Sequence, residues 1–238
     1  MEARLTVCFA PCPVIFDLDG TLIDSAPDIH ACVNAVLNDA KEPPLTLDKV
    51  RRFIGGGVEA LWRNVMDVRP LQGLRLADLV SAFMTRYVDA HDLTQVFPGV
   101  PDMLGVLADR GHPLGICTNK PLGVTQAALV RCGLSDLFAC VIGGDSTPHR
   151  KPHPAPLLAA LAALGTDPRR PQALYVGDSE YDATCAAAIP VPFLLYTQGY
   201  RRSAPSALVH AAAFDDFRQL PALIERWSPA ARLPVGQA

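Results

Sequence analysis

The chain has 238 residues and a formal net charge of −3, and half of its residues are hydrophobic. This length suits one large domain, or a core domain with a smaller insert, and the composition is sufficient for a sizeable buried core. The chain lacks the basic excess of nucleic-acid-binding proteins, and no apolar run approaches the roughly 18 residues of a membrane span. Its proline-interrupted N-terminus is a poor signal peptide. We therefore expect a cytoplasmic protein without nucleic acid or a membrane as partner.

The first apolar segment, residues 13–18, predicts a strand, and a purely helical block follows it. Four helical patterns succeed one another there with no strand between them: residues 26–40, 46–54, 58–67 and 74–91. We therefore expect a small helical domain inserted over a sheet. The predicted parts are a core of residues 1–24 and 93–227, the helical insert at 25–92, and a flexible tail at 228–238.

Beyond the insert, strand-like segments alternate with helical ones. The expected strands are residues 113–118, 139–144, 172–178 and 192–197, and the expected helices are residues 124–134, 155–164 and 179–188. Strands that are apolar on both faces and alternate with helices are typical of a parallel sheet covered on each side. The predicted fold class is therefore α/β, with a Rossmann-like, doubly wound parallel sheet as its core.

Polar residues of the kinds that a phosphate site needs follow several of the expected strands. Ligands of open parallel sheets bind beyond the carboxyl ends of the strands. Side chains that follow neighbouring strands should therefore converge at one edge of the sheet. In chain order, these residues are Asp17, Asp19, Thr21, Thr118, Asn119, Lys151, Asp178 and Asp182.

Each of these elements also has an ordinary structural explanation when it is taken alone. Asp and Gly are common turn residues, so Asp-x-Asp-Gly could simply end a strand. Asp178 could cap the helix that begins near Ser179, and Asp182 would suit the first turns of that helix. A single Thr-Asn or Lys-Pro pair says little. Their joint occurrence, in order and at the predicted ligand edge, favours a functional site.

The two aspartates after the first strand need a counter-charge. Carboxylates about 4 Å apart repel by several kcal/mol at an effective dielectric constant of about 20. A hard divalent cation removes this cost, and Asp17 with Asp178 supplies the oxygen ligands that Mg²⁺ prefers. Asp17 can then attack phosphorus and form an aspartyl-phosphate. Asp19 can protonate the leaving alcohol and later deprotonate the water that hydrolyses the intermediate.

The remaining strand-end residues suit the phosphate itself. Phosphoryl transfer requires its equatorial oxygens to be held and neutralised. The Thr118 hydroxyl and Asn119 can donate hydrogen bonds, and Lys151 supplies a compact positive charge. Backbone N–H groups around Gly20 and Thr21 can add a small anion-binding nest. We expect Asp182 to orient Lys151 or a metal-bound water.

Four segments resemble, in order, the motifs of the haloacid dehalogenase superfamily: "DLDGTL", "CTN", "RKPHP" and "GDSEYD". The resemblance extends from Val14 to about Thr197. It implies a Rossmann-like core, a Mg²⁺ cofactor and an aspartyl-phosphate intermediate. It also implies that Asp19 binds the metal through its main-chain carbonyl, and that the helical insert is a C1-type cap whose closure keeps bulk water from the reaction.

Longer stretches resemble bacterial phosphoglycolate phosphatases: "DLDGTLIDSAPDI", "FIGGGVEAL", "FPGV" and "VIGGDSTPHRKPHPAPLL". This resemblance implies a phosphatase that hydrolyses 2-phosphoglycolate to glycolate and phosphate, in carbon salvage. Relatives with similar motifs act on other sugar phosphates or on pyrophosphate, so the small-molecule phosphate ester stays open. A phosphomutase like β-phosphoglucomutase would retain both aspartates. A dehalogenase would have no need of Asp19.

Substrate choice is expected to reside in the cap. In "VRRFIGGGVEALW", Gly56 and its neighbours let the backbone approach a ligand, and their N–H groups precede a helix expected from Val58. A substrate carboxylate would suit that helix start, with Arg51 or Arg52 as counter-charge. The alternative is a flexible turn with two solvated arginines. The aromatic residues of "FMTRY" are expected to pack cap helices.

Two alternatives outside this superfamily are a signalling receiver and a non-catalytic phosphate-binding protein. A phospho-accepting signalling receiver also places acidic residues, a Thr and a Lys on a doubly wound sheet. Such a receiver is about half this length, and its acidic pair precedes the phosphorylated Asp by a wide margin. A non-catalytic phosphate-binding protein would have no use for both a nucleophile and an acid/base. The sequence leaves monomer and homodimer equally open.

Overall fold

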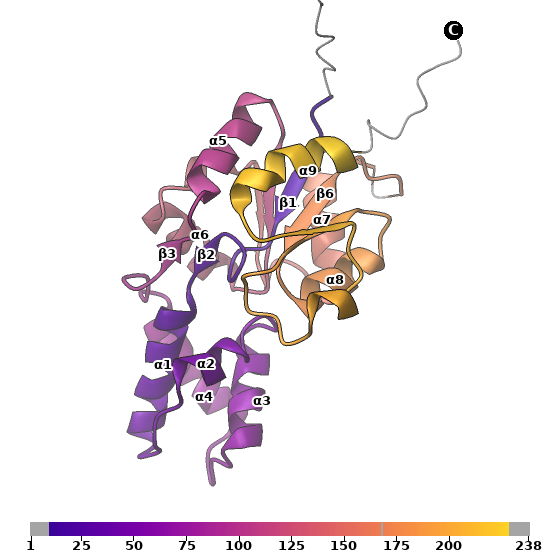
Figure 1. Ribbon diagram of the computed structural model, residues 1–238. Helices are drawn as coiled ribbons and strands as arrows, with labels where there is room; N and C mark the ends of the chain where they lie inside the picture. The colour runs from indigo at the N-terminus through magenta and orange to yellow at the C-terminus, as the bar shows by residue number, and fades with distance from the viewer. Residues whose placement is uncertain (1–9, 168, 229–238) are drawn as a thin grey trace, which may run out of the picture.

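A six-stranded parallel sheet forms the centre of the computed structural model, which describes residues 10–167 and 169–228 (Figure 1). The strand order is β5-β4-β1-β6-β7-β8. The first strand in the sequence is therefore central, and later strands lie on both sides of it, as in a doubly wound sheet. The strands are β1 (Val14–Phe16), β4 (Leu114–Cys117), β5 (Cys140–Ile142), β6 (Leu174–Gly177), β7 (Phe193–Tyr196) and β8 (Ala212–Phe214).

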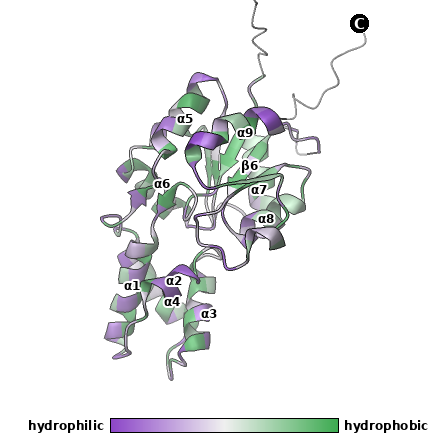
Figure 2. Cartoon of the chain, in the orientation of Figure 1, coloured by the Kyte–Doolittle hydropathy of each residue, from purple (hydrophilic) through white to green (hydrophobic). Residues whose placement is uncertain are grey.

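Helices cover both faces of this sheet, because successive side chains of each strand point to opposite faces. Val14 and Phe16 pack in one apolar cluster with α5, α6 and α9, whereas Ile15 packs in another with α7 and α8. In Figure 2 the central strands are mostly coloured as hydrophobic and the surrounding helices carry both colours. These helices are α5 (Val100–Asp109), α6 (Leu122–Arg131), α7 (Ala155–Ala163), α8 (Glu180–Ala187) and α9 (Leu220–Trp227).

The four helices after β1 form a separate bundle below the sheet in Figure 1. They are α1 (Ala26–Asp39), α2 (Leu47–Arg51), α3 (Val58–Val68) and α4 (Leu76–Tyr87). They enclose their own apolar cluster around Trp62 and Phe83, to which the sheet-side helices add Val124. We call this bundle the cap. A two-stranded antiparallel ribbon, β2 (Ile23–Asp24) with β3 (Gln95–Val96), joins it to the sheet.

The predicted α/β fold class and all five predicted strands are confirmed, each strand being two or three residues shorter than expected. The sequence analysis did not predict β8, α5, α9 or the ribbon at the base of the cap. The strand β8 is short and only half-buried, so it lacks the apolar pattern by which strands are recognised. The domain boundaries at residues 25 and 92 stay predictions.

Two predictions about the chain as a whole bear on the described residues only in part. Within residues 10–167 and 169–228, no helix has the length and hydrophobicity of a membrane span. The cytoplasmic location stays a prediction. The flexible tail predicted at 228–238 lies outside the described residues except for Ser228, which is buried behind α9.

Candidate active site

The carboxyl ends of the three central strands meet at one point. Phe16 at the end of β1 is aligned with Ile116 of β4 and with Val176 of β6. The Asp17 N–H continues the ladder by donating to the Val176 carbonyl at 2.9 Å. The residues that follow these strands therefore emerge at the same edge of the sheet. This alignment brings the predicted strand-end residues together.

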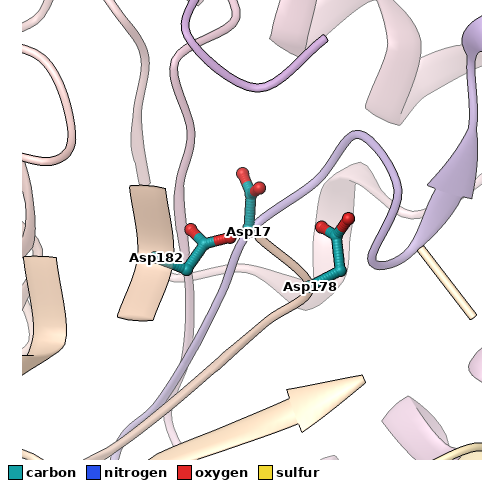
Figure 3. A group of neighbouring side chains, drawn as sticks. All are labelled: Asp17, Asp178 and Asp182. Atoms are coloured by element: carbon teal, nitrogen blue, oxygen red, sulfur yellow. The ribbon is translucent and has the colours of Figure 1, made fainter. Parts of the chain in front are cut away.

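Three buried carboxylates gather at that edge, as Figure 3 shows. Asp17 follows β1, Asp178 follows β6, and Asp182 lies in the first turn of α8. One oxygen from each lies within 4.8 Å of the others. Asp182 is largely occupied by protein partners: its Oδ1 accepts from Tyr175 at 2.5 Å, and its Oδ2 accepts from the Ser179 hydroxyl at 2.6 Å. Asp17 and Asp178 are therefore the better placed to hold a metal ion.

Lys151 is a buried cation that contacts two of these three carboxylates. Its Nζ is 2.8 Å from Asp17 Oδ1 and 2.7 Å from Asp182 Oδ1. It also donates to the Cys117 carbonyl at 2.8 Å and to the Tyr175 hydroxyl at 3.0 Å. The contact with Asp17 is an ion pair without an aligned hydrogen bond, and Asp17 Oδ1 has none within the described part of the chain. Asp17 thus keeps an oxygen that a metal or a phosphorus atom can use.

The ionisation of these groups reflects their burial. Desolvation, with the nearby Asp182 charge, raises the pKa of Asp17 to about 7 from 3.8. Desolvation also raises the pKa of Asp178 well above its ordinary value. Burial would raise the pKa of Asp182 as well, but the Lys151 ammonium outweighs it and lowers that pKa. Asp182 and Lys151 therefore form an ion pair, whereas burial disfavours the ionised forms of Asp17 and Asp178, which a divalent cation would stabilise.

The turn after β1 contains Asp19, and the next two residues, Gly20 and Thr21, lie against Asp178. Gly20 has φ +86°, and a Cβ there would lie 2.7 Å from Asp178 Oδ2. The position therefore requires glycine. Thr21 donates from its hydroxyl to Asp178 Oδ1 at 2.8 Å. The Tyr200 N–H donates to the other oxygen of Asp178 at 2.6 Å. Gly20 and Thr21 thus support a carboxylate, and their predicted contact with phosphate stays a prediction.

Asp19 points to the opposite side of the turn, toward the cap. Its Oδ1 accepts from the Ser25 hydroxyl at 2.6 Å and from Lys120 Nζ at 3.0 Å. Asp19 lines a small cavity of about 40 Å³ between the sheet edge and the cap, together with Asp17 and Thr118. A phosphate ester in this cavity could be reached both by Asp17 as nucleophile and by Asp19 as acid/base.

Asn119 makes a different set of contacts from the one predicted. Its Nδ2 donates to the Lys151 carbonyl and to the Gly55 carbonyl of the cap, both at 2.8 Å. Its Oδ1 accepts from the Lys151 N–H at 2.9 Å. The side chain therefore fixes the Lys151 loop and ties the cap to the core, and a bond to phosphate would have to replace one of these.

Two predicted cap residues do not reach the cavity. Arg52 is exposed, and Gly56 packs against Tyr181, so neither is among the residues that line it. The neighbouring Gly55 and Gly57 do line it. The cap wall is otherwise mainly apolar, formed by Ile29, Ile54, Val58, Leu61 and Phe83.

Two residues at the cavity were missed by the sequence analysis. Lys120 lines it and is buried, although it directly follows the predicted pair Thr118 and Asn119. Tyr87 packs with Phe83 as expected for "FMTRY", with ring centroids 4.7 Å apart, but its hydroxyl also contacts Lys120 Nζ. The adjacency of Lys120 to the second motif was the available signal, whereas nothing local marked Tyr87.

Comparison with known proteins gives one consistent answer. A family model described as "Haloacid dehalogenase-like hydrolase" matches residues 14–196. A phosphoglycolate phosphatase of Rhodobacter capsulatus is 46% identical over 90% of this chain and 97% of its own length. One from Rhodospirillum rubrum is 40% identical, over 88% and 89%. The crystal structure of a "predicted phosphoglycolate phosphatase" from Haemophilus somnus 129pt superposes with a TM-score of 0.83 at 30% identity, over 90% and 97%. The similarity spans both the sheet and the cap.

Proposed function

This chain belongs to the family of haloacid dehalogenase-like hydrolases, and on that basis we propose that it hydrolyses 2-phosphoglycolate to glycolate and phosphate with Mg²⁺ as cofactor. The observation that carries the proposal is the placement of Asp17 and Asp19 on one cavity, with Lys151 and Asp178 beside Asp17. The relatives named phosphoglycolate phosphatase support the choice of substrate.

The reaction consists of two displacements at phosphorus. A carboxylate oxygen of Asp17 attacks the phosphorus atom, the bond from phosphorus to the ester oxygen breaks, and Asp19 donates a proton to the departing alkoxide. Asp19 then takes a proton from a water whose oxygen attacks the phosphorus of the aspartyl-phosphate. This step releases phosphate and regenerates the Asp17 carboxylate. Lys151 Nζ lies 2.8 Å from Asp17 Oδ1, and its positive charge stabilises the negative charge on the transferring phosphoryl group.

The donor set at the strand ends fits a hard divalent cation. The side chains of Asp17 and Asp178 and the main-chain carbonyl of Asp19 would hold Mg²⁺. When bound, Mg²⁺ neutralises phosphate charge and orients the phosphoryl group. Thr21 and Tyr200 orient Asp178 for this role through the two hydrogen bonds they donate to its oxygens.

The cavity supports a short leaving group. A cavity this small, with mainly apolar cap walls, favours a short leaving group over a bulky one. A sugar would place several hydroxyl groups against the apolar side chains, and each buried hydroxyl without a partner costs roughly 1–3 kcal/mol. A two-carbon acid brings no hydroxyl groups to these walls, and its carboxylate requires a cationic partner. Closure of the cap over the cavity would exclude bulk water while Asp17 carries the phosphoryl group.

A panel of phosphate esters, assayed with Mg²⁺ and with a chelator, tests the proposal. We expect the highest kcat/KM for 2-phosphoglycolate, weak turnover of sugar phosphates and pyrophosphate, and no turnover without divalent metal. The variant Asp17→Asn should lose turnover while it keeps its fold. Asp67→Asn, which neutralises an exposed carboxylate on α3, is the matched control and should behave as wild type. A flat substrate profile would overturn the assignment of substrate.

A further inference from the structure

A buried lysine that the mechanism above does not use lies on the leaving-group side of the cavity. Lys120 follows β4 and is only 5% exposed. Its Nζ donates to Asp19 Oδ1 at 3.0 Å, and Asp19 is the residue that protonates the ester oxygen. Lys151, which serves the phosphate, lies instead beside Asp17 and Asp182. The two lysines thus contact different members of the pair of aspartates, Lys120 beside Asp19 and Lys151 beside Asp17.

The second partner of Lys120 comes from the cap. The Tyr87 hydroxyl, at the end of α4, contacts Lys120 Nζ, and the ammonium lies 4.5 Å from the centroid of the Tyr87 ring. An ammonium group has three N–H donors. Asp19 and Tyr87 therefore hold the group in place without using all of its capacity for charge-assisted bonds.

Charge around the cavity is unevenly distributed. Among the described residues that line it, Lys120 is the only one with a positive charge, and Asp17 and Asp19 are the only negative ones. A leaving group with its own carboxylate would bring a further negative charge into a cavity that already contains the Asp17 carboxylate, which is unfavourable in a site of low dielectric. Lys120 is the lining group able to offset that repulsion.

We propose that Lys120, positioned by Tyr87, binds the carboxylate of the substrate's leaving group and so selects short anionic phosphate esters over neutral ones. The inference rests on the proposed function and deepens it. In 2-phosphoglycolate one carbon atom separates the ester oxygen from the carboxylate. A molecule whose ester oxygen faces Asp19 therefore has its carboxylate within reach of a cation that is 3.0 Å from Asp19.

The test compares two substrates of similar size that differ in this charge. We expect wild type to prefer 2-phosphoglycolate to ethyl phosphate in kcat/KM. Lys120→Met should reduce that preference by about 10- to 100-fold, because a charge-assisted hydrogen bond is lost for one substrate only. Tyr87→Phe should reduce it a few-fold. Lys49→Met, which removes an exposed lysine of α2, is the matched control and should keep the wild-type preference.

The alternative is that Lys120 only positions Asp19. Turnover of both substrates would then fall equally in Lys120→Met, and the unchanged preference would overturn the inference while leaving the proposed function intact. A wild type with no preference would overturn the proposed function and the inference together.

Product inhibition supplies a readout that does not depend on the variant's own turnover rate. Glycolate should inhibit wild type and Lys49→Met with similar inhibition constants, and its inhibition constant for Lys120→Met should be about tenfold higher. Inorganic phosphate should inhibit all three proteins alike. Equal inhibition by phosphate also establishes that Lys120→Met is folded. If Lys120→Met fails to fold, Lys120→Arg provides the comparison, because it keeps a positive charge at this position. Glycolate should still inhibit Lys120→Arg, and a loss of this inhibition would contradict the proposal.

Discussion

The core side and the cap side of the cavity are built from opposite kinds of residue. On the core side, buried charged groups lie next to one another. The ammonium of Lys151, for example, contacts four groups: Asp17, Asp182, Tyr175 and the Cys117 carbonyl. The cap side is mainly apolar, and its Tyr87 hydroxyl contacts a core lysine. The core is therefore suited to hold a phosphoryl group, whatever its substituent. The cap limits the size of that substituent, and Lys120 at the junction senses its charge.

Removing the core cation should have the largest effect. In Lys151→Met we expect kcat/KM to fall by about 100- to 1,000-fold for 2-phosphoglycolate and for ethyl phosphate alike, because both present the same phosphoryl group. The metal-free variant should also lose about 3–5 kcal/mol of unfolding free energy, since Asp17 and Asp182 lose a buried partner. Steady-state kinetics and urea denaturation measure the two effects. A fall in kcat/KM for only one of the two substrates would contradict the division of roles between the core side and the cap side of the cavity.

The electrostatic cost on the core side should appear as a pH-dependent response to Mg²⁺. The folded-state pKa of Asp17 is about 7, above its ordinary value of 3.8, and the pKa of Asp178 is raised as well. Between these values the folded chain binds more protons than the unfolded chain, so the free energy of unfolding falls as pH rises through this window. A bound cation removes that loss. Mg²⁺ should therefore stabilise the protein more above about pH 7 than near pH 5.5.

Thermal melts with chelator and with Mg²⁺ across this range measure the difference. Each kcal/mol corresponds to about 2–4 °C in a chain of this length. Asp17→Asn serves as the control, because it has no titrating carboxyl group at this position. In this variant the Mg²⁺-induced shift in melting temperature should depend less on pH. A Mg²⁺-induced shift that is equal at all pH values would contradict the assignment of Asp17 and Asp178 as ligands.

The core side was largely accessible from the sequence. Asp17, Thr118 and Asp178 directly follow apolar strands, and parallel strands of a doubly wound sheet end at one edge, so chain order alone implied their convergence. Lys151 was predicted at the same edge although a proline-rich loop separates it from β5, and its contact with Asp17 was not predicted. The orientation of the Asn119 side chain toward the Lys151 loop could not be predicted, because it depends on hydrogen bonds to backbone groups far away in the chain.

The cap side was less predictable for a physical reason. Its cavity wall is formed where α3 and α4 approach the sheet, and that approach is a tertiary contact with no local pattern. The three consecutive glycines suggested a ligand-binding turn, but their backbone angles decide which of them faces the cavity, and Gly55 and Gly57 do so instead of Gly56. Likewise Tyr87 reads as a packing residue until Lys120 is placed beside its hydroxyl.

The central claim is that Asp17 carries the phosphoryl group during turnover, and acid quenching of the enzyme with 2-phosphoglycolate and Mg²⁺ tests it most directly. The aspartyl-phosphate should survive the quench, and mass spectrometry should place the phosphoryl group on Asp17, with none in Asp17→Asn. Phosphorylation of Asp178 or Asp182 instead, or turnover with no phosphorylated enzyme at any time, would contradict the account.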